Sequence, residues 1–138
     1  MSSLPSVAKV QVLHHNHNQF AYIFMNAVFF ETSAFTEHRP GYLDDENYRS
    51  LQAAMLENPS IGDLMPRTGG FRKLRWPDQR RGKGKRGGLR IIYYWLLGDG
   101  QFWMVSIYDK DEREKLTCEQ ERQLKWAIHA ELKKRGMQ

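Results

Sequence analysis

Three β-strand patterns in close succession constrain the fold of this chain more than any other feature of its sequence. Residues 71–76 have the period of a strand, with Leu74 and Trp76 on one face and Lys73 and Arg75 on the other. Residues 89–97 are almost continuously apolar, as in a central strand, and the glycine-containing turn at 98–100 leads into a further strand at 101–108. Because short connections join antiparallel neighbours, these segments predict a meander.

The residues before the meander predict one more strand and two helices. The stretch 26–32 is rich in apolar and aromatic residues and has the composition of a strand. A short helix is expected next, and it should stop by Pro40-Gly41. The acidic residues 44–46 begin a second helix, which must end before Pro59.

A loop at 61–70 and a C-terminal helix complete the pattern. Thr117 and Gln120 have the spacing of a capping box at the start of that helix. Its buried stripe is expected at Leu124, Ala127, Ile128 and Leu132. The order of strand, two helices, three-strand meander and helix predicts an α+β fold with helices against a small antiparallel sheet.

One domain is expected at residues 25–138, because the chain is long enough for a single modest core. Residues 1–24 differ in composition and show little periodicity, so they are predicted to be a disordered leader or a misassigned start, with Met25 as the alternative start. The single cysteine, Cys118, excludes an internal disulfide and suits a reducing compartment. With no apolar run long enough for a membrane span, the sequence predicts a cytoplasmic protein with no membrane partner.

Basic residues are concentrated in one segment. The 138-residue chain has a net charge of +5, yet residues 67–90 hold ten Lys and Arg against one acid, Asp78. Such a concentrated patch indicates a phosphate-bearing partner. The run Gly82–Gly87 matches G-x-G-x-x-G, but a strand rather than a helix follows it, so nucleotide binding is rejected and a cationic loop remains. Residues expected to contact RNA are Arg72, Trp76, Lys83, Lys85 and Arg86.

A candidate catalytic cluster comes from Lys73 and Arg75 on one predicted strand and Arg90 at the start of the next, with Lys110 just after the last strand. Guanidinium and ammonium groups that converge on one face bind a phosphate and stabilise the charge that develops as it is displaced. A lysine crowded among cations also has a lowered pKa and can transfer protons near neutral pH. Cleavage of RNA by its own 2′-hydroxyl needs no more than these groups. The alternative is that they line a solvated sheet face.

The sequence predicts no metal and no cofactor. It contains no H-E-x-x-H motif, and the acidic residues 44–46 are better explained by helix capping. His38 and His129 are far apart and fall on predicted helices, which argues against a paired-histidine ribonuclease.

Several segments together carry a family resemblance. They are residues 30–36, 44–52, 69–76, 82–95, 108–112 and 116–117. Over about residues 26–135 they resemble the HigB branch of the RelE toxin superfamily. The resemblance implies a small antiparallel sheet flanked by helices, and a toxin of a type II toxin–antitoxin module that cuts mRNA in the ribosomal A site.

The resemblance also implies roles for individual residues. Lys73, Arg75 and Arg90 stand where RelE-type toxins have their catalytic and phosphate-binding basic residues, and Lys110 stands where RelE has an arginine. The chain departs from RelE at the C-terminal tyrosine, for which Tyr108 is a candidate replacement. The implied partners are mRNA, the ribosome and a helix-turn-helix antitoxin, through which the complex would contact operator DNA.

Other readings remain open at the level of sequence. A ParE-like toxin shares the fold and inhibits DNA gyrase, but it generally lacks the full basic set. A non-catalytic RNA- or ribosome-binding module would use the same patch, and an inactive toxin would retain the fold alone.

Overall fold

A computed structural model describes residues 7–13, 27–82, 84, 88–96, 100–112 and 116–136 of the chain. Its strands are β1 (Val7–Leu13), β2 (Ala27–Thr32), β3 (Asp63–Leu64), β4 (Arg72–Trp76), β5 (Leu89–Leu96) and β6 (Gln101–Asp109). Its helices are α2 (Ser33–Tyr42), α3 (Asp45–Glu57) and α4 (Cys118–Lys134), with a 3-10 turn, η1, at Gln79–Arg81. The predicted α+β class is confirmed. Within the described ranges, each helix is too short or too polar to cross a lipid bilayer.

The six strands form one sheet in the order β1-β2-β6-β5-β4-β3. The predicted meander is confirmed, because β5 pairs antiparallel with both β4 and β6. The expectation of an entirely antiparallel sheet is wrong, since β2 lies parallel to β6. A parallel pair needs a long crossover, and α2, α3 and the first two meander strands provide it. The sheet is therefore mixed.

Two of the strands lie where the sequence pattern predicts none. Residues 7–13, within the predicted disordered leader, form β1 and pair antiparallel with β2. The alternation of Val10 and Val12 with polar neighbours is the signal for this strand. The rest of the leader lies outside the described residues. In the predicted 61–70 loop, β3 pairs with β4, and a strand of two residues is too short to show a period.

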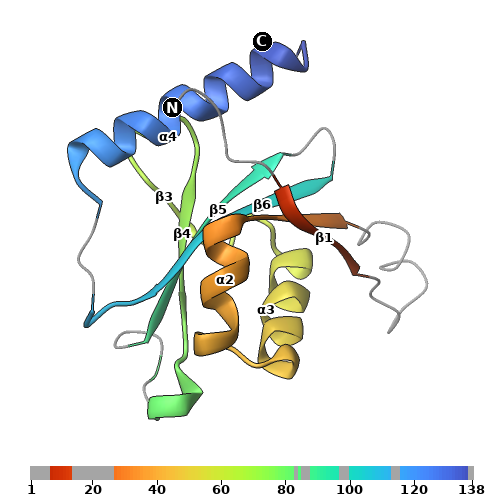
Figure 1. Cartoon of the computed structure of the whole chain (residues 1–138), viewed down its shortest axis with the longest axis vertical. Coiled ribbons are helices and arrows are strands. Elements are labelled where there is room, and N and C mark those ends of the chain that lie inside the picture. The colour runs from red at the N-terminus through yellow and green to blue at the C-terminus, as the bar shows by residue number, and fades with distance from the viewer. Residues whose placement is uncertain are drawn as a thin grey trace.

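The sheet carries a hydrophobic core on each face. Figure 1 shows α2 and α3 side by side in front of the sheet and α4 across its upper end. Fully buried residues on the α2/α3 face include Phe29, Phe35, Leu51, Met55, Leu89, Ile91 and Phe102. The α4 face has Phe71, Ile92, Tyr108, Ala127 and Ile128 buried together, with Leu124 and Leu132 packed against them. The predicted stripe on α4 is thus confirmed.

A side chain caps the start of each α-helix. Asp44 accepts a hydrogen bond from the Asn47 N–H and starts α3, which ends at Glu57, before Pro59 as predicted. Thr117 and Gln120 form the predicted capping box of α4. The expected stop of α2 by Pro40-Gly41 is wrong, because the helix continues to Tyr42. Pro40 lacks the N–H that would bond to the Thr36 carbonyl, and α2 ends two residues later, so this helical hydrogen bond is lost only in the last turn.

A buried polar cluster joins β2 to the two helices in front of it. Glu31 is buried and accepts hydrogen bonds from the Tyr48 hydroxyl at 2.6 Å and from the Thr36 hydroxyl at 2.7 Å. Burial and then the neighbouring Glu31 raise the pKa of Tyr48 well above its ordinary value. The phenol is therefore kept neutral in the folded protein.

The raised pKa of Tyr48 predicts alkaline destabilisation. An unfolded tyrosine loses its proton near pH 10, whereas the folded one retains it, so the free energy of unfolding should fall as the pH rises above about 10. One such group contributes a slope of at most about 1.4 kcal/mol per pH unit. Urea unfolding between pH 8 and 11 should show a smaller slope for Tyr48→Phe than for the wild type. An identical slope would exclude Tyr48 as the source.

Candidate functional site

The strand register brings the predicted basic residues onto one face of the sheet. Arg75 of β4 lies directly opposite Arg90 of β5, and Lys73 lies two positions before Arg75 on the same strand. Arg90 in turn lies opposite Tyr108 of β6. Directly opposite residues point to the same side of a sheet, as do residues two apart on a strand. Lys73, Arg75, Arg90 and Tyr108 therefore share a face, and we call these four residues the cationic face.

Arg90 and Arg75 differ in their environment. Arg90 is only 8% exposed and donates a hydrogen bond to the Leu89 carbonyl oxygen at 3.1 Å, whereas Arg75 is exposed. Burial, and then the charge of Arg75, lower the pKa of Arg90, while Tyr108 and Asp111 oppose this effect. Arginine nevertheless stays charged in proteins. A partly desolvated guanidinium beside an exposed one gives a concentrated positive potential.

The turn after β6 is held next to the cationic face. The Lys110 N–H donates to the Gly88 carbonyl oxygen at 3.2 Å, which extends the pairing of β5 and β6 by one step. Asp109 is fully buried and accepts from the Asp111 N–H at 2.8 Å. Lys110 is exposed, and the alternation of β6 puts its position on the side of Tyr108.

Two of the predicted RNA-binding residues lie on the other face of the sheet. Arg72 donates to the Gly62 carbonyl oxygen at 2.7 Å and to that of Ser60 at 3.3 Å. Trp76 packs against the α2/α3 core. The structure therefore does not bring Arg72 and Trp76 together with the cationic face. The other predicted RNA contacts, Lys83, Lys85 and Arg86, lie outside the described residues.

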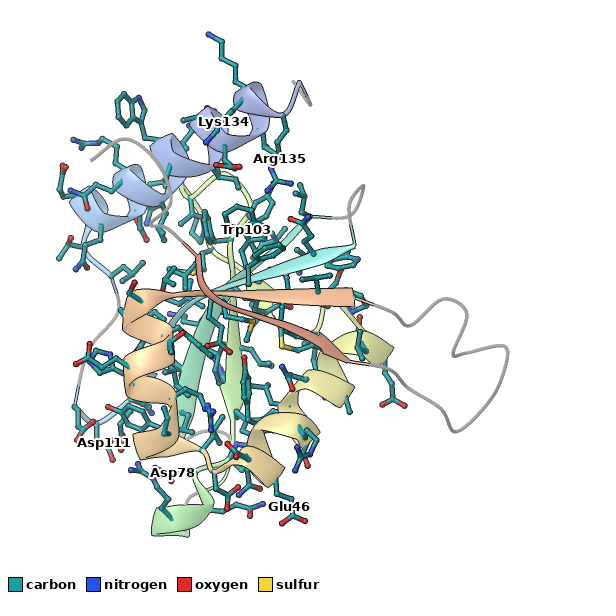
Figure 2. All side chains as sticks on the ribbon, turned by 45° about the vertical axis from the view of Figure 1, so that its right-hand side comes forward. Glu46, Asp78, Trp103, Asp111, Lys134 and Arg135 are labelled. Carbon is teal, nitrogen blue, oxygen red and sulfur yellow. The ribbon has the colours of Figure 1, made fainter. Side chains whose placement is uncertain are left out.

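The beginning of the basic loop is tied to α2 and to the turn after β6. Asp78 is fully buried and accepts from the Arg80 Nε at 3.0 Å and the Arg80 Nη2 at 2.8 Å. The Arg80 guanidinium lies 4.8 Å from the centre of the Tyr42 ring, and the Tyr42 hydroxyl donates to Glu112 at 2.8 Å. Figure 2 shows Asp78 and Asp111 at the same lower end of the molecule, away from Trp103 and Arg135.

The other end of the basic loop depends on a glycine. A Cβ atom at Gly88 would lie 2.5 Å from the Trp76 carbonyl oxygen and 2.7 Å from that of Gly84. Real Cβ atoms essentially never approach backbone atoms so closely, so the chain closes here only with glycine. The loop thus leaves β4 and enters β5 at adjacent points, which fixes the approach of Arg75 to Arg90.

Sequence reasoning missed two carboxylates near the predicted basic residues. Asp111 is an electrostatic neighbour of Arg90, and Asp63 of β3 lies directly opposite Lys73. The position of Asp63 depends on the register of β3, which no sequence period reveals. Within the described part of the chain, no three His, Cys, Asp or Glu residues gather in a way that would hold a metal ion.

A scan against models of known protein families found no match to this chain.

Proposed function

We propose that this protein is a metal-independent endoribonuclease, the toxin of a type II toxin–antitoxin module of the RelE/HigB kind. The observation that carries the proposal is the direct opposition of Arg75 and Arg90, with Lys73 on the same face. Guanidinium groups are suited to bidentate contact with phosphate oxygens, and two of them side by side can hold one phosphodiester. The resemblance of the central segments to HigB toxins supports the same assignment.

The reaction needs positive charge more than it needs a nucleophile from the protein. The 2′-oxygen of the RNA attacks the adjacent phosphorus and loses its proton, while the 5′-oxygen of the next nucleotide leaves and gains one. The products are a 2′,3′-cyclic phosphate and a 5′-hydroxyl. Arg75 and Arg90 would stabilise the charge on the phosphoryl oxygens in the transition state. Lys73, Lys110 and Tyr108 are the candidates for the two proton transfers.

The proposal extends to the partners and the compartment. The substrate is mRNA in the ribosomal A site, in the cytoplasm, where the ribosome supplies much of the binding. The inhibitor is a helix-turn-helix antitoxin, which either covers the cationic face or prevents entry into the ribosome. Operator DNA would be contacted only through that complex.

Mapping of mRNA ends after induction tests this proposal. We expect new 5′ ends within translated regions when the chain is expressed without its antitoxin, and we expect the ends to disappear when initiation on the same mRNA is blocked. Intact transcripts with altered plasmid supercoiling would replace the proposal with gyrase inhibition. Intact transcripts bound to the protein would reduce it to a non-catalytic RNA- or ribosome-binding module.

A further inference from the structure

A small pocket lies beside the cationic face, at the outer edge of the sheet. It has a volume of about 170 Å³. Figure 1 shows β3 and β4 running up to the N-terminal half of α4. Residues of β3, β4 and α4 line the pocket. Its lining includes Asp63, Leu64, Met65, Lys73, Leu116 and Glu121. Because Lys73 belongs to both the pocket and the cationic face, a ligand that reaches one can extend into the other.

The size of the pocket limits its occupant. Pockets for drug-sized ligands begin at roughly 300 Å³, so this one suits a single flat ring system and not a larger molecule. Leu64, Met65 and Leu116 give it apolar walls, and Leu64 is 61% exposed although it is a large apolar residue. An exposed apolar side chain beside a pocket is suited to packing against an aromatic ring.

Two carboxylates of the pocket can accept hydrogen bonds from a ligand. Asp63 and Glu121 are carboxylates, which can only accept hydrogen bonds when ionised. Glu121 is held in place by Arg67, whose Nε lies 2.9 Å from Oε1. The Arg67 Nη2 donates to the other oxygen, Oε2, at 3.5 Å. Each carboxylate oxygen has two lone-pair sites, so each keeps capacity for one further donor. Arg67 lines the pocket as well, but its guanidinium is engaged by Glu121, so the carboxylates supply the acceptor sites open to a ligand.

We propose that this pocket binds a nucleobase that bears an exocyclic amino group, with the adjoining phosphate held at Lys73 and Arg75. Apolar walls contact the faces of the base, and the amino group of adenine, guanine or cytosine donates to Asp63 or Glu121. Uracil has no exocyclic amino group and offers only its ring N3–H between two carbonyl oxygens, which a carboxylate would repel, so it binds less well. This inference rests on the proposed function, because it makes the pocket a base-specificity site of the same nuclease.

Titration of the intact protein with 5′-nucleotides tests the pocket without any cleavage. The protein would be labelled at its leucine and methionine methyl groups, and the probes would be AMP, GMP, CMP, UMP and ribose 5-phosphate. We expect AMP, GMP and CMP to shift the methyl signals of Leu64, Met65 and Leu116. UMP should bind about tenfold more weakly, since one hydrogen bond to a charged group is lost. Equal shifts with ribose 5-phosphate, or shifts confined to other methyl groups, would overturn the inference.

Two variants of pocket residues and one control variant test the binding site in the same titration. Asp63→Asn replaces an acceptor with an amide and should reduce the preference for amino-bearing bases, and Leu116→Trp should fill the pocket and abolish the shifts of Leu64 and Met65. Glu57→Gln removes an exposed carboxylate on α3 and should change nothing. An unaltered preference in Asp63→Asn together with unaltered shifts in Leu116→Trp would place base binding elsewhere.

The pocket and the nuclease can fail separately. If the methyl shifts are base-selective but the protein cuts no transcript, the nucleobase site is supported and the proposed nuclease activity is disproved. If transcripts are cut but the methyl groups of the pocket do not respond to nucleotides, the nuclease activity is supported and the nucleobase site is disproved.

Discussion

Replacing both Lys73 and Arg90 with alanine should abolish growth inhibition while the protein remains folded. The two changes remove a partly buried and a buried cation from the cationic face, where a phosphodiester would lie against Arg75. Loss of one preorganised group that stabilises transition-state charge costs about 100-fold to 1,000-fold in rate. Loss of two should therefore reduce mRNA cleavage by more than about 100-fold. Growth curves and mapped transcript ends measure the effect.

A matched double variant separates the loss of catalytic groups from the loss of net positive charge. Arg122→Ala with Lys134→Ala also removes one arginine and one lysine, but from exposed positions on α4. This control should remain toxic, and both double variants should unfold cooperatively. Continued toxicity of a folded Lys73→Ala, Arg90→Ala protein would remove these residues from the mechanism.

Gly88→Ala should weaken both the fold and the activity. The added Cβ would meet the Trp76 carbonyl oxygen at 2.5 Å and the Asp78 N at 3.0 Å, and neither backbone atom can turn away as a flexible side chain can. Overpacking of this kind costs roughly 1–3 kcal/mol. The required shift also separates the adjoining ends of β4 and β5, so Arg75 and Arg90 lose their alignment.

A substitution at a second glycine provides the control, and its expected effect on the free energy of unfolding has the opposite sign. A Cβ atom at Gly41 in α2 would meet nothing within 4 Å. Gly41→Ala should therefore raise the free energy of unfolding by about 0.5–1 kcal/mol, because alanine favours the helix. Urea unfolding measures both variants. Equal stability of Gly88→Ala and the wild type would show that the loop closes without its glycine.

The sequence pattern predicted the features that depend on residues close together in the chain. The capping pair Thr117 and Gln120 specifies the start of α4, and the alternation of β4 separates Lys73 and Arg75 from Leu74. Pairing between distant segments left no such signal. The parallel contact of β2 with β6 joins residues about 70 positions apart, and the sequence pattern does not distinguish it from an antiparallel arrangement.

The candidate site was predictable to the same extent. The alternation of β4 and the connection to β5 put Arg75 and Arg90 on one face, which the register confirms. Trp76 was expected to contact RNA, although the same alternation places it on the α2/α3 side. Asp63 escaped prediction because β3 has only two residues, so its partner on β4 is a property of the assembled sheet.

The ends of the RNA fragments test the central claim most directly. If the cationic face promotes attack by the 2′-oxygen of the RNA without a metal, fragments recovered from a purified translating system should carry a 2′,3′-cyclic phosphate and a 5′-hydroxyl. In this assay the ribosomes keep the divalent cations that they already hold. Cleavage should occur without any further metal ion being added. Fragments that carry a 5′-phosphate, or an absolute requirement for an added metal ion, would contradict the account.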